Sequence, residues 1–159
     1  MFCNDIQFVN FVEDDLSIEC AYIQAKDDTS VYLVLCLPKF SDRIFFSISD
    51  GLPDNIARYV AHVAEVDSKK NIDITHVIQF SDEYMEENGV VGVLLSSHKL
   101  SKVFQAIDHE FVKHNMILKP IFLIFISHVE YRVWKESGNN SLMDYFSKTK
   151  KDVILFNQL

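Results

Sequence analysis

Glycine, proline and cysteine are all scarce in this chain of 159 residues, which contains four, three and three of them. Because long flexible linkers are usually rich in glycine or proline, this scarcity and the modest length predict one domain over residues 1–159. The three cysteines, Cys3, Cys20 and Cys36, are widely spaced and form no CxxC pair. Cys20 and Cys36 fall in apolar runs, so we expect buried, reduced thiols and a cytoplasmic location.

A long hydrophobic run is also missing. The most apolar stretch, Ile121 to Ile126, is six residues long, whereas a helix that crosses a membrane needs roughly 20. The first residues of the chain carry neither the basic start nor the apolar stretch of a secretory signal. We therefore expect a soluble protein with no membrane partner.

Basic side chains are few in the first two thirds of the chain. Residues 1–98 hold 17 acidic and 6 basic side chains, a net charge of −11. Residues 99–159 hold 6 acidic and 9 basic side chains, a net charge of +3, and the whole chain therefore carries −8. With an isoelectric point near 5.1, the chain is negatively charged at neutral pH and repels the phosphate backbone of nucleic acids. The basic stretch 148–151 is too short to reverse this repulsion. The sequence thus predicts no nucleic-acid partner and favours a basic protein partner.

Motifs that hold phosphates, metals or a nucleophile are absent from the sequence. Neither GxxxxGKS/T nor GxGxxG occurs, so no cofactor is predicted. His109 and His114 invite comparison with the zinc motif HExxH, but they are five residues apart and point roughly 140° apart around a helix. Ser96 and Ser97 lack the glycines of a nucleophile elbow, so their expected role is helix capping. We therefore predict no metal site and no catalytic residue.

Hydrophobic alternation predicts strands in the opening part of the chain. Polar and apolar residues alternate at 16–24 and at 43–48, which is typical of strands with one buried face. Residues 31–37 are apolar on both faces, as in a central strand covered on both sides. With a first strand at 6–12, these segments predict an antiparallel meander of four strands.

Helices and strands alternate in the rest of the chain. Apolar residues recur at helical spacing over 53–66 and 99–115. Short helices are expected at 81–87 and near 141–147, where Ser141 and Asp144 approximate a capping box, and strands at 72–80, 90–95, 120–134 and 153–156. This order predicts a single α+β domain, in which a mainly antiparallel sheet with the N-terminal meander packs against two or three helices.

Acidic side chains cluster in predicted turns and in one short predicted helix. Turns at opposite ends of one strand of about nine residues lie roughly 30 Å apart, so the groups at 14–15 and 27–28 are not expected to form one patch. A solvated surface that keeps the protein soluble is one interpretation, and a docking surface for a basic protein is the other. The predicted partner contacts are Asp14, Asp15, Asp27, Asp28, Glu83, Glu86 and Glu87.

The sequence thus favours a small acidic cytosolic binding protein that occupies a basic protein partner. Bacterial immunity proteins that neutralise toxins, often basic nucleases, are similar in physical character, since they are small, acidic and without a catalytic signature. The analogy implies an immunity-type inhibitor that blocks the functional site of its partner. The oligomeric state stays open at this level, and a homo-oligomer is compatible with the sequence.

An enzyme or ligand-binding domain is the alternative, with a site built from histidines and carboxylates of separate elements. His76, His128 and Glu130 are the first candidates, because a histidine at the end of a strand can serve as a general base. A concave pocket holding these side chains would favour the alternative. Acidic residues around a flat or shallow surface would favour the binding protein.

Overall fold

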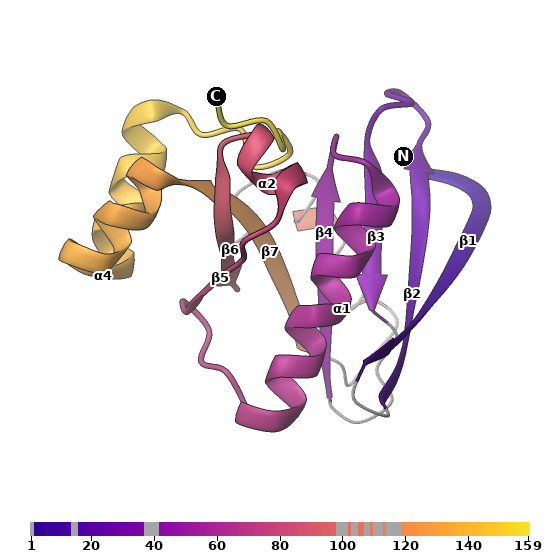
Figure 1. Ribbon diagram of the computed structural model, residues 1–159. Helices are drawn as coiled ribbons and strands as arrows, with labels where there is room; N and C mark the ends of the chain where they lie inside the picture. Colours follow the sequence, from indigo (N-terminus) through magenta and orange to yellow (C-terminus); the bar gives the residue numbers. More distant parts are fainter. Residues whose placement is uncertain are drawn as a thin grey trace.

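The computed structural model describes residues 2–13, 16–36, 42–97 and 119–159, with five further positions between 98 and 118. Its strands are β1 (Phe2–Glu13), β2 (Leu16–Ala25), β3 (Tyr32–Cys36), β4 (Arg43–Ser49), β5 (Val77–Gln79), β6 (Val90–Ser96) and β7 (Lys119–Ser127), and its helices are α1 (Pro53–Lys70), α2 (Glu83–Glu87) and α4 (His128–Thr149). The described strands form one sheet in the order β1-β2-β3-β4-β7-β6-β5 (Figure 1).

The meander predicted from the N-terminal sequence is confirmed. β1, β2, β3 and β4 follow one another in the sheet, and each pairs with the next in antiparallel orientation. β6 is antiparallel to both β5 and β7, whereas β4 and β7 pair in parallel. The predicted fold class, an α+β domain with a mainly antiparallel sheet, is therefore confirmed.

The two faces of the sheet build two hydrophobic clusters. α1 crosses one face (Figure 1), where its buried Ile56 and Val60 belong to the same cluster as Phe45 of β4. The next residue, Phe46, points to the opposite face and belongs to a second cluster that includes Leu142 of α4. Each fully buried side chain of this size stabilises the fold by roughly 1.5–3 kcal/mol. Both faces of the central strands are therefore covered.

The strand predicted over 120–134 is wrong in its second half, because helix α4 begins at His128. The hydroxyl of Ser127 accepts a hydrogen bond from the N–H of Glu130, and a carboxylate oxygen of Glu130 accepts one from the N–H of Ser127, at 3.3 and 2.8 Å. This reciprocal capping box starts the helix. The helix expected near 141–147 is part of α4, which is kinked at Gly138, where φ is 82°.

Two other predicted strands differ from the structure. In the segment 72–80 only β5 is a strand, because Thr75 adopts a positive φ of 81° that an extended strand does not allow. Residues 153–156 form no strand in the described tail, yet Phe156 is buried. Two apolar residues of this segment, Val153 and Phe156, are buried by side-chain packing and not by strand pairing. The helix predicted over 99–115 lies mostly outside the described residues.

Gly92 of β6 allows a close approach between β6 and β5. A Cβ added at this position would lie 2.5 Å from the backbone carbonyl oxygen of Ile78 in β5. We expect Gly92→Ala to push β5 away from β6 and to lower the free energy of unfolding by roughly 1–3 kcal/mol. Urea denaturation measures this change, and faster hydrogen exchange at the β5 amides locates it. Unchanged stability would contradict the tight pairing.

Candidate functional site

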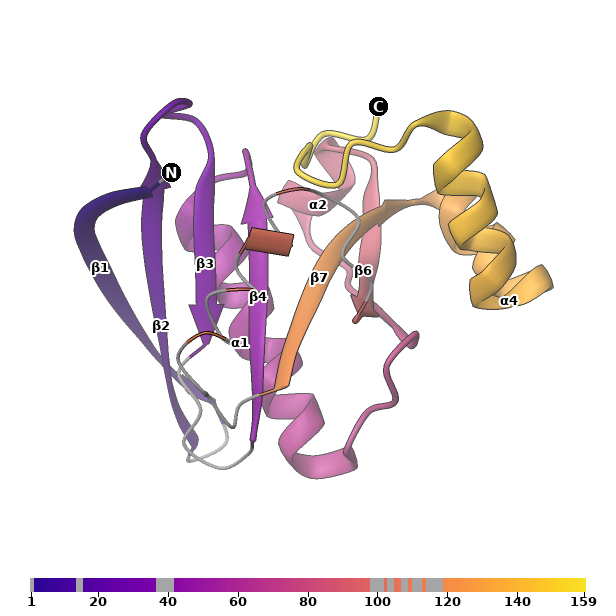
Figure 2. The same ribbon diagram turned by 180° about the vertical axis from the view of Figure 1, so that it is seen from behind.

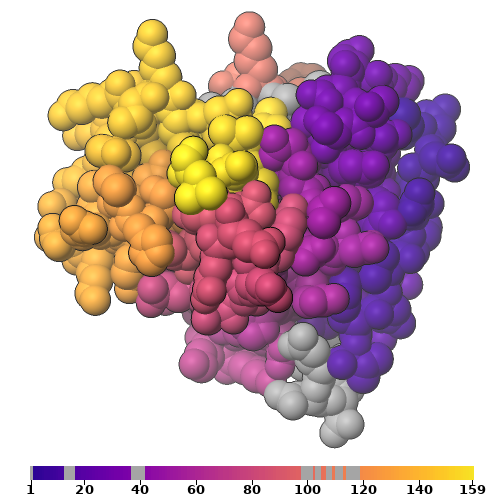
Figure 3. All heavy atoms as spheres, turned by 45° about the horizontal axis from the view of Figure 1, so that its top comes forward, coloured from indigo at the N-terminus to yellow at the C-terminus, as the bar shows by residue number. Residues whose placement is uncertain are grey.

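One end of the sheet gathers exposed carboxylates from three separate segments. These segments are the turn 26–31 between β2 and β3, the start of α1, and α2, and Figure 3 shows them together on one face of the molecule. We call this surface the acidic end. Its exposed acidic residues are Asp27, Asp28, Asp54, Glu83, Glu86 and Glu87.

The turn 26–31 is held in shape by one of its own carboxylates. The hydroxyl and the backbone N–H of Ser30 both donate to Oδ1 of Asp28, at 2.6 and 2.9 Å. These hydrogen bonds lower the pKa of Asp28, because they favour its charged form. The N–H of Val31 also donates to the carbonyl oxygen of Asp28, at 3.1 Å. The turn is therefore held in shape, Asp28 is kept in its charged form, and both carboxylates of the turn are exposed.

Two tyrosines connect the three segments of the acidic end. Tyr22 of β2 makes a hydrogen bond to Asp54 in the first turn of α1, and burial together with this carboxylate raises the pKa of Tyr22. The N–H of Leu52, just before α1, donates to Oη of Tyr84 in α2 at 2.8 Å. Direct side-chain contacts thus join the N-terminal end of α1 to β2 on one side and to α2 on the other.

Asp82 fixes the start of the short helix α2. One of its carboxylate oxygens accepts a hydrogen bond from the N–H of Met85 at 2.8 Å and another from the hydroxyl of Tyr59 at 2.9 Å. Burial, and then the Asp82 carboxylate, raise the pKa of Tyr59, so its hydroxyl keeps the proton that it donates. This N-cap bond satisfies a helix donor that would otherwise lack a partner. The hydrogen bond from Tyr59 also ties α2 to the middle of α1.

The C-terminal tail packs on α2 as well. The ring of Phe156 stacks on that of Tyr84, with centroids 4.9 Å apart. The N–H of Phe156 donates to Oδ1 of Asp50 at 2.6 Å, and the N–H of Gln158 donates to the carbonyl oxygen of Asn88 at 2.7 Å. The acidic end therefore presents its charges on a preorganised surface rather than on loose loops.

The structure places most of the predicted partner contacts at this end of the sheet. Asp54 and the apolar Leu52, which is 58% exposed, lie there too but are missing from the sequence prediction. An acidic residue directly after a proline is a signal for a helix start that could have identified Asp54. Asp14 and Asp15 lie outside the described residues. The predicted contacts located at the acidic end are Asp27, Asp28, Glu83, Glu86 and Glu87.

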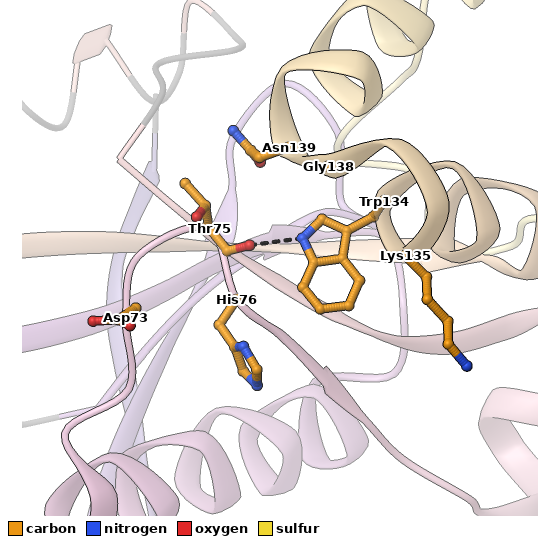
Figure 4. Close-up of a pocket in the computed structure, with 7 residues that line it drawn as sticks. All are labelled: Asp73, Thr75, His76, Trp134, Lys135, Gly138 and Asn139. Carbon is orange, nitrogen blue, oxygen red and sulfur yellow. Dashed lines mark hydrogen bonds between the residues drawn. The ribbon is translucent and has the colours of Figure 1, made fainter.

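A separate hollow of about 440 Å³ lies beside the kink of α4 (Figure 4). Trp134 forms one wall, and its indole N–H donates to the carbonyl oxygen of Thr75 at 2.9 Å. The ring of His76 meets Trp134 edge-on, with centroids 5.8 Å apart. The hollow thus combines an aromatic wall with charged and polar side chains. Its lining residues are Asp73, Thr75, His76, Trp134, Lys135, Gly138 and Asn139.

Of the three residues proposed for a dispersed catalytic site, His76 lines this hollow. His128 is exposed at the first position of α4. Glu130 is buried, and one of its carboxylate oxygens lies 2.9 Å from Nζ of Lys151 in an ion pair. The structure therefore brings neither His128 nor Glu130 into the lining of the hollow.

The two cysteines predicted to be buried are confirmed in that state. Cys20 and Cys36 lie directly opposite each other in β2 and β3, and they are 0% and 5% exposed. A hydrogen bond with Cys36, followed by burial, raises the pKa of Cys20. Since the thiolate is the reactive form of cysteine, the raised pKa keeps the Cys20 thiol in its less reactive protonated form.

The described part of the chain holds no group of three or more histidine, cysteine, aspartate or glutamate side chains that could bind a metal ion. Within that same part of the chain, each helix is too short or too polar to span a membrane.

Comparison with known proteins relates this chain to others through its fold. No family model matches the sequence, and no curated protein matches it either. A crystal structure of a protein from Neisseria gonorrhoeae, described as a SUFU (suppressor of fused protein) homologue, superposes with a TM-score of 0.72. The match covers 98% of this chain and 86% of that one at 12% sequence identity. At this identity the likeness shows that the two share a fold.

Proposed function

We propose that this protein is a small cytoplasmic binding protein whose acidic end captures a basic protein partner. The observation that carries the proposal is the gathering of exposed carboxylates from three segments onto one end of the sheet. Opposite charges on two surfaces attract each other before contact, and this steering raises the association rate. More specifically, we propose an immunity-type inhibitor that covers the basic functional surface of a toxin such as a nuclease.

The surface also supplies what a tight inhibitor needs beyond charge. Leu52 is 58% exposed among the carboxylates, next to Tyr84, which is partly buried. Apolar and aromatic anchors of this kind usually contribute most of the binding energy at the centre of an interface, with charges around them. Because hydrogen bonds fix the turn 26–31 and α2, little conformational entropy is lost on binding.

Such a surface suits competition with nucleic acid. A nuclease holds its substrate through basic side chains that neutralise phosphates. A rigid array of carboxylates occupies the same side chains and so keeps the substrate out. Inhibition of this kind needs no catalytic residue, metal or cofactor in the inhibitor itself.

Reversing two charges at the acidic end should slow binding. We expect Glu83→Lys with Glu87→Lys to reduce the association rate with the partner about 10-fold, because the steering field weakens. The partner is first captured from cells of the native host at low salt with the unmodified protein, and it is identified by mass spectrometry. Surface plasmon resonance then gives both rate constants at several salt concentrations, and the activity of the partner is assayed with and without the protein.

Glu136→Lys with Asp144→Lys is the matched control. Both residues are exposed on α4, and the pair changes the net charge by the same amount. The control should bind nearly as fast as the unmodified protein. If both double variants slow association equally, the overall net charge determines the association rate, and the acidic end is not the docking surface. A captured partner with no excess of basic residues would contradict the proposal outright.

Ligand binding in the hollow beside α4 is the second candidate function. A β-branched residue with positive φ is strained, and such strain concentrates at functional sites, so Thr75 beside Trp134 favours this candidate. Trp134 is the single tryptophan of the chain, which makes its fluorescence a direct reporter of the hollow. A saturable change in emission on titration with a small-molecule fraction of host cells would support a ligand site. An unchanged emission favours the binding protein.

A further inference from the structure

β1 lies at one margin of the sheet with its outer edge open. In the sheet order it has β2 as its neighbour, and no other described element lies beyond it in either view (Figures 1 and 2). The strand is 12 residues long, its pairing with β2 is regular from Ile6 to Glu13 after an irregularity between Phe2 and Ile6, and it contains no lysine, arginine or proline. Those are the residues that usually prevent a second strand from pairing with an exposed edge.

One face of this edge strand carries three exposed apolar side chains. Ile6, Phe8 and Val12 are 49%, 62% and 74% exposed. They share a face because side chains alternate along a strand, and the cross-strand partner of Phe8 on that face is the buried Ala21. The exposed side chains therefore extend the apolar face of the sheet out to its margin. A long, open and apolar edge favours the addition of another strand.

We propose that β1 pairs with β1 of a second copy of this chain, antiparallel and with Gln7 opposite Gln7 of that copy. In this register Ile6 lies opposite Phe8 of the second copy, and Phe8 lies opposite its Ile6. The four side chains form one apolar cluster across the junction, and cross-strand pairs of this type stabilise a sheet. The arrangement is a two-fold symmetric interface in which one patch meets itself.

The neighbouring symmetric registers are less favourable. Pairing centred on Phe8 would place Ile6 opposite the polar Asn10, which separates the apolar side chains. Pairing centred on Val9 would place Asp5 opposite Glu13, and like charges directly opposite each other destabilise a strand pair. Pairing centred on Gln7 places Asp5 opposite Val9 and avoids both problems.

The proposed dimer also keeps the two acidic ends apart from each other. A two-fold axis perpendicular to the sheet reverses the strand direction of the second copy, so its acidic end points the opposite way. The exposed carboxylates of the two acidic ends then lie at opposite ends of a continuous sheet, so the repulsion between these two groups is weak. Each end remains open, so the dimer presents two docking surfaces.

Oligomeric state measured by light scattering and by sedimentation tests the pairing. Between about 1 and 200 μM the full chain should shift from monomer to dimer. Phe8→Lys should weaken dimerisation at least 10-fold, because it places two like charges in the apolar cluster, and circular dichroism checks that the variant is folded. Val129→Lys is the matched control, since Val129 is 50% exposed on α4, and this variant should dimerise normally.

Disulfide cross-linking tests the register. In a Cys3→Ser background, Gln7→Cys should give a linked dimer on mild oxidation, because the two side chains face each other across the axis. Asn10→Cys should not, since it lies six residues from its own copy along the strand, roughly 20 Å. A monomer at all concentrations, a dimer insensitive to Phe8→Lys, or linkage through Asn10→Cys alone would overturn the proposal. So would a monomer whose capture of another protein depends on Phe8.

Discussion

Replacing Glu130 with glutamine should lower the free energy of unfolding by about 3–5 kcal/mol. The side chains of Glu130 and Lys151 are 7% and 6% exposed, and their charged atoms lie 2.9 Å apart. Nζ of Lys151 also hydrogen-bonds to the side-chain oxygen of Gln158 and lies over the ring of Phe146. Glu130→Gln leaves a buried ammonium without its counter-charge. Glutamine can still accept the capping-box hydrogen bond from the N–H of Ser127, so the decrease in the free energy of unfolding measures the loss of the ion pair.

Removing both charges should restore most of the stability. In Glu130→Gln with Lys151→Met, no uncompensated charge stays in the core, and exchanging a buried pair for uncharged residues is often nearly neutral. Urea denaturation of the two single variants and the double variant gives the coupling energy. Glu136→Gln, at an exposed position of the same helix, should change stability by less than about 0.5 kcal/mol. Strictly additive losses would contradict a coupled pair.

The same lysine makes stability depend on pH. Burial lowers the pKa of Lys151 below its usual value of 10.5, and the neighbouring Glu130 offsets part of that shift. The folded chain therefore releases this proton at lower pH than the unfolded chain does. From this group alone, stability rises as pH approaches 10.5 and is lost as pH falls through the lowered pKa. Lys151→Met should flatten that rise relative to the unmodified protein.

Phe156→Ala should also lower the free energy of unfolding by about 3–5 kcal/mol, as expected for a buried phenylalanine truncated in a packed core. Phe156 is 2% exposed, stacks on Tyr84 and meets Phe125 edge-on, with ring centroids 4.9 Å apart in both pairs. Its loss removes the contact that holds the tail against α2. We therefore expect weaker partner binding in addition to lower stability.

Thermal and urea unfolding measure the stability change, and Leu155→Ala serves as the control. Leu155 is adjacent in sequence but 44% exposed, so its truncation should cost less than about 0.5 kcal/mol. Hydrogen exchange in α2 should increase for Phe156→Ala and stay unchanged for Leu155→Ala. Equal effects at the two positions would show that the tail does not hold α2.

Much of the fold could be predicted from local pattern. The alternation in β2 and β4 and the fully apolar β3 indicate the meander directly, because each face of a strand repeats every second residue. The pattern misleads at Val129, Tyr131 and Val133, which alternate as in a strand but lie in α4. The capping pair Ser127 and Glu130 determines the structure there. Single residues, such as Thr75 with its positive φ, end a strand without any change in hydrophobic pattern.

The sequence predicts most of the acidic residues that belong to the candidate site, but not that they lie together in the folded protein. Acidic turns and the acidic short helix are visible in the sequence, including Asp27, Asp28 and Glu83. Their meeting at one end depends on the directions of β2, β4 and β5, and on the contact between Leu52 and Tyr84. That contact joins residues 32 positions apart, a separation that local sequence patterns do not encode. The sequence shows only the charges that the fold brings together.

Hydrogen–deuterium exchange on the complex with the captured partner tests the central claim most directly. The amides of the β2–β3 turn, of the segment 50–55 and of α2 should exchange more slowly in the complex than in the free protein. The outer part of α4, including the region of Glu136, should be unaffected. Protection confined to α4 or to the hollow at Trp134, with none at the acidic end, would contradict the account.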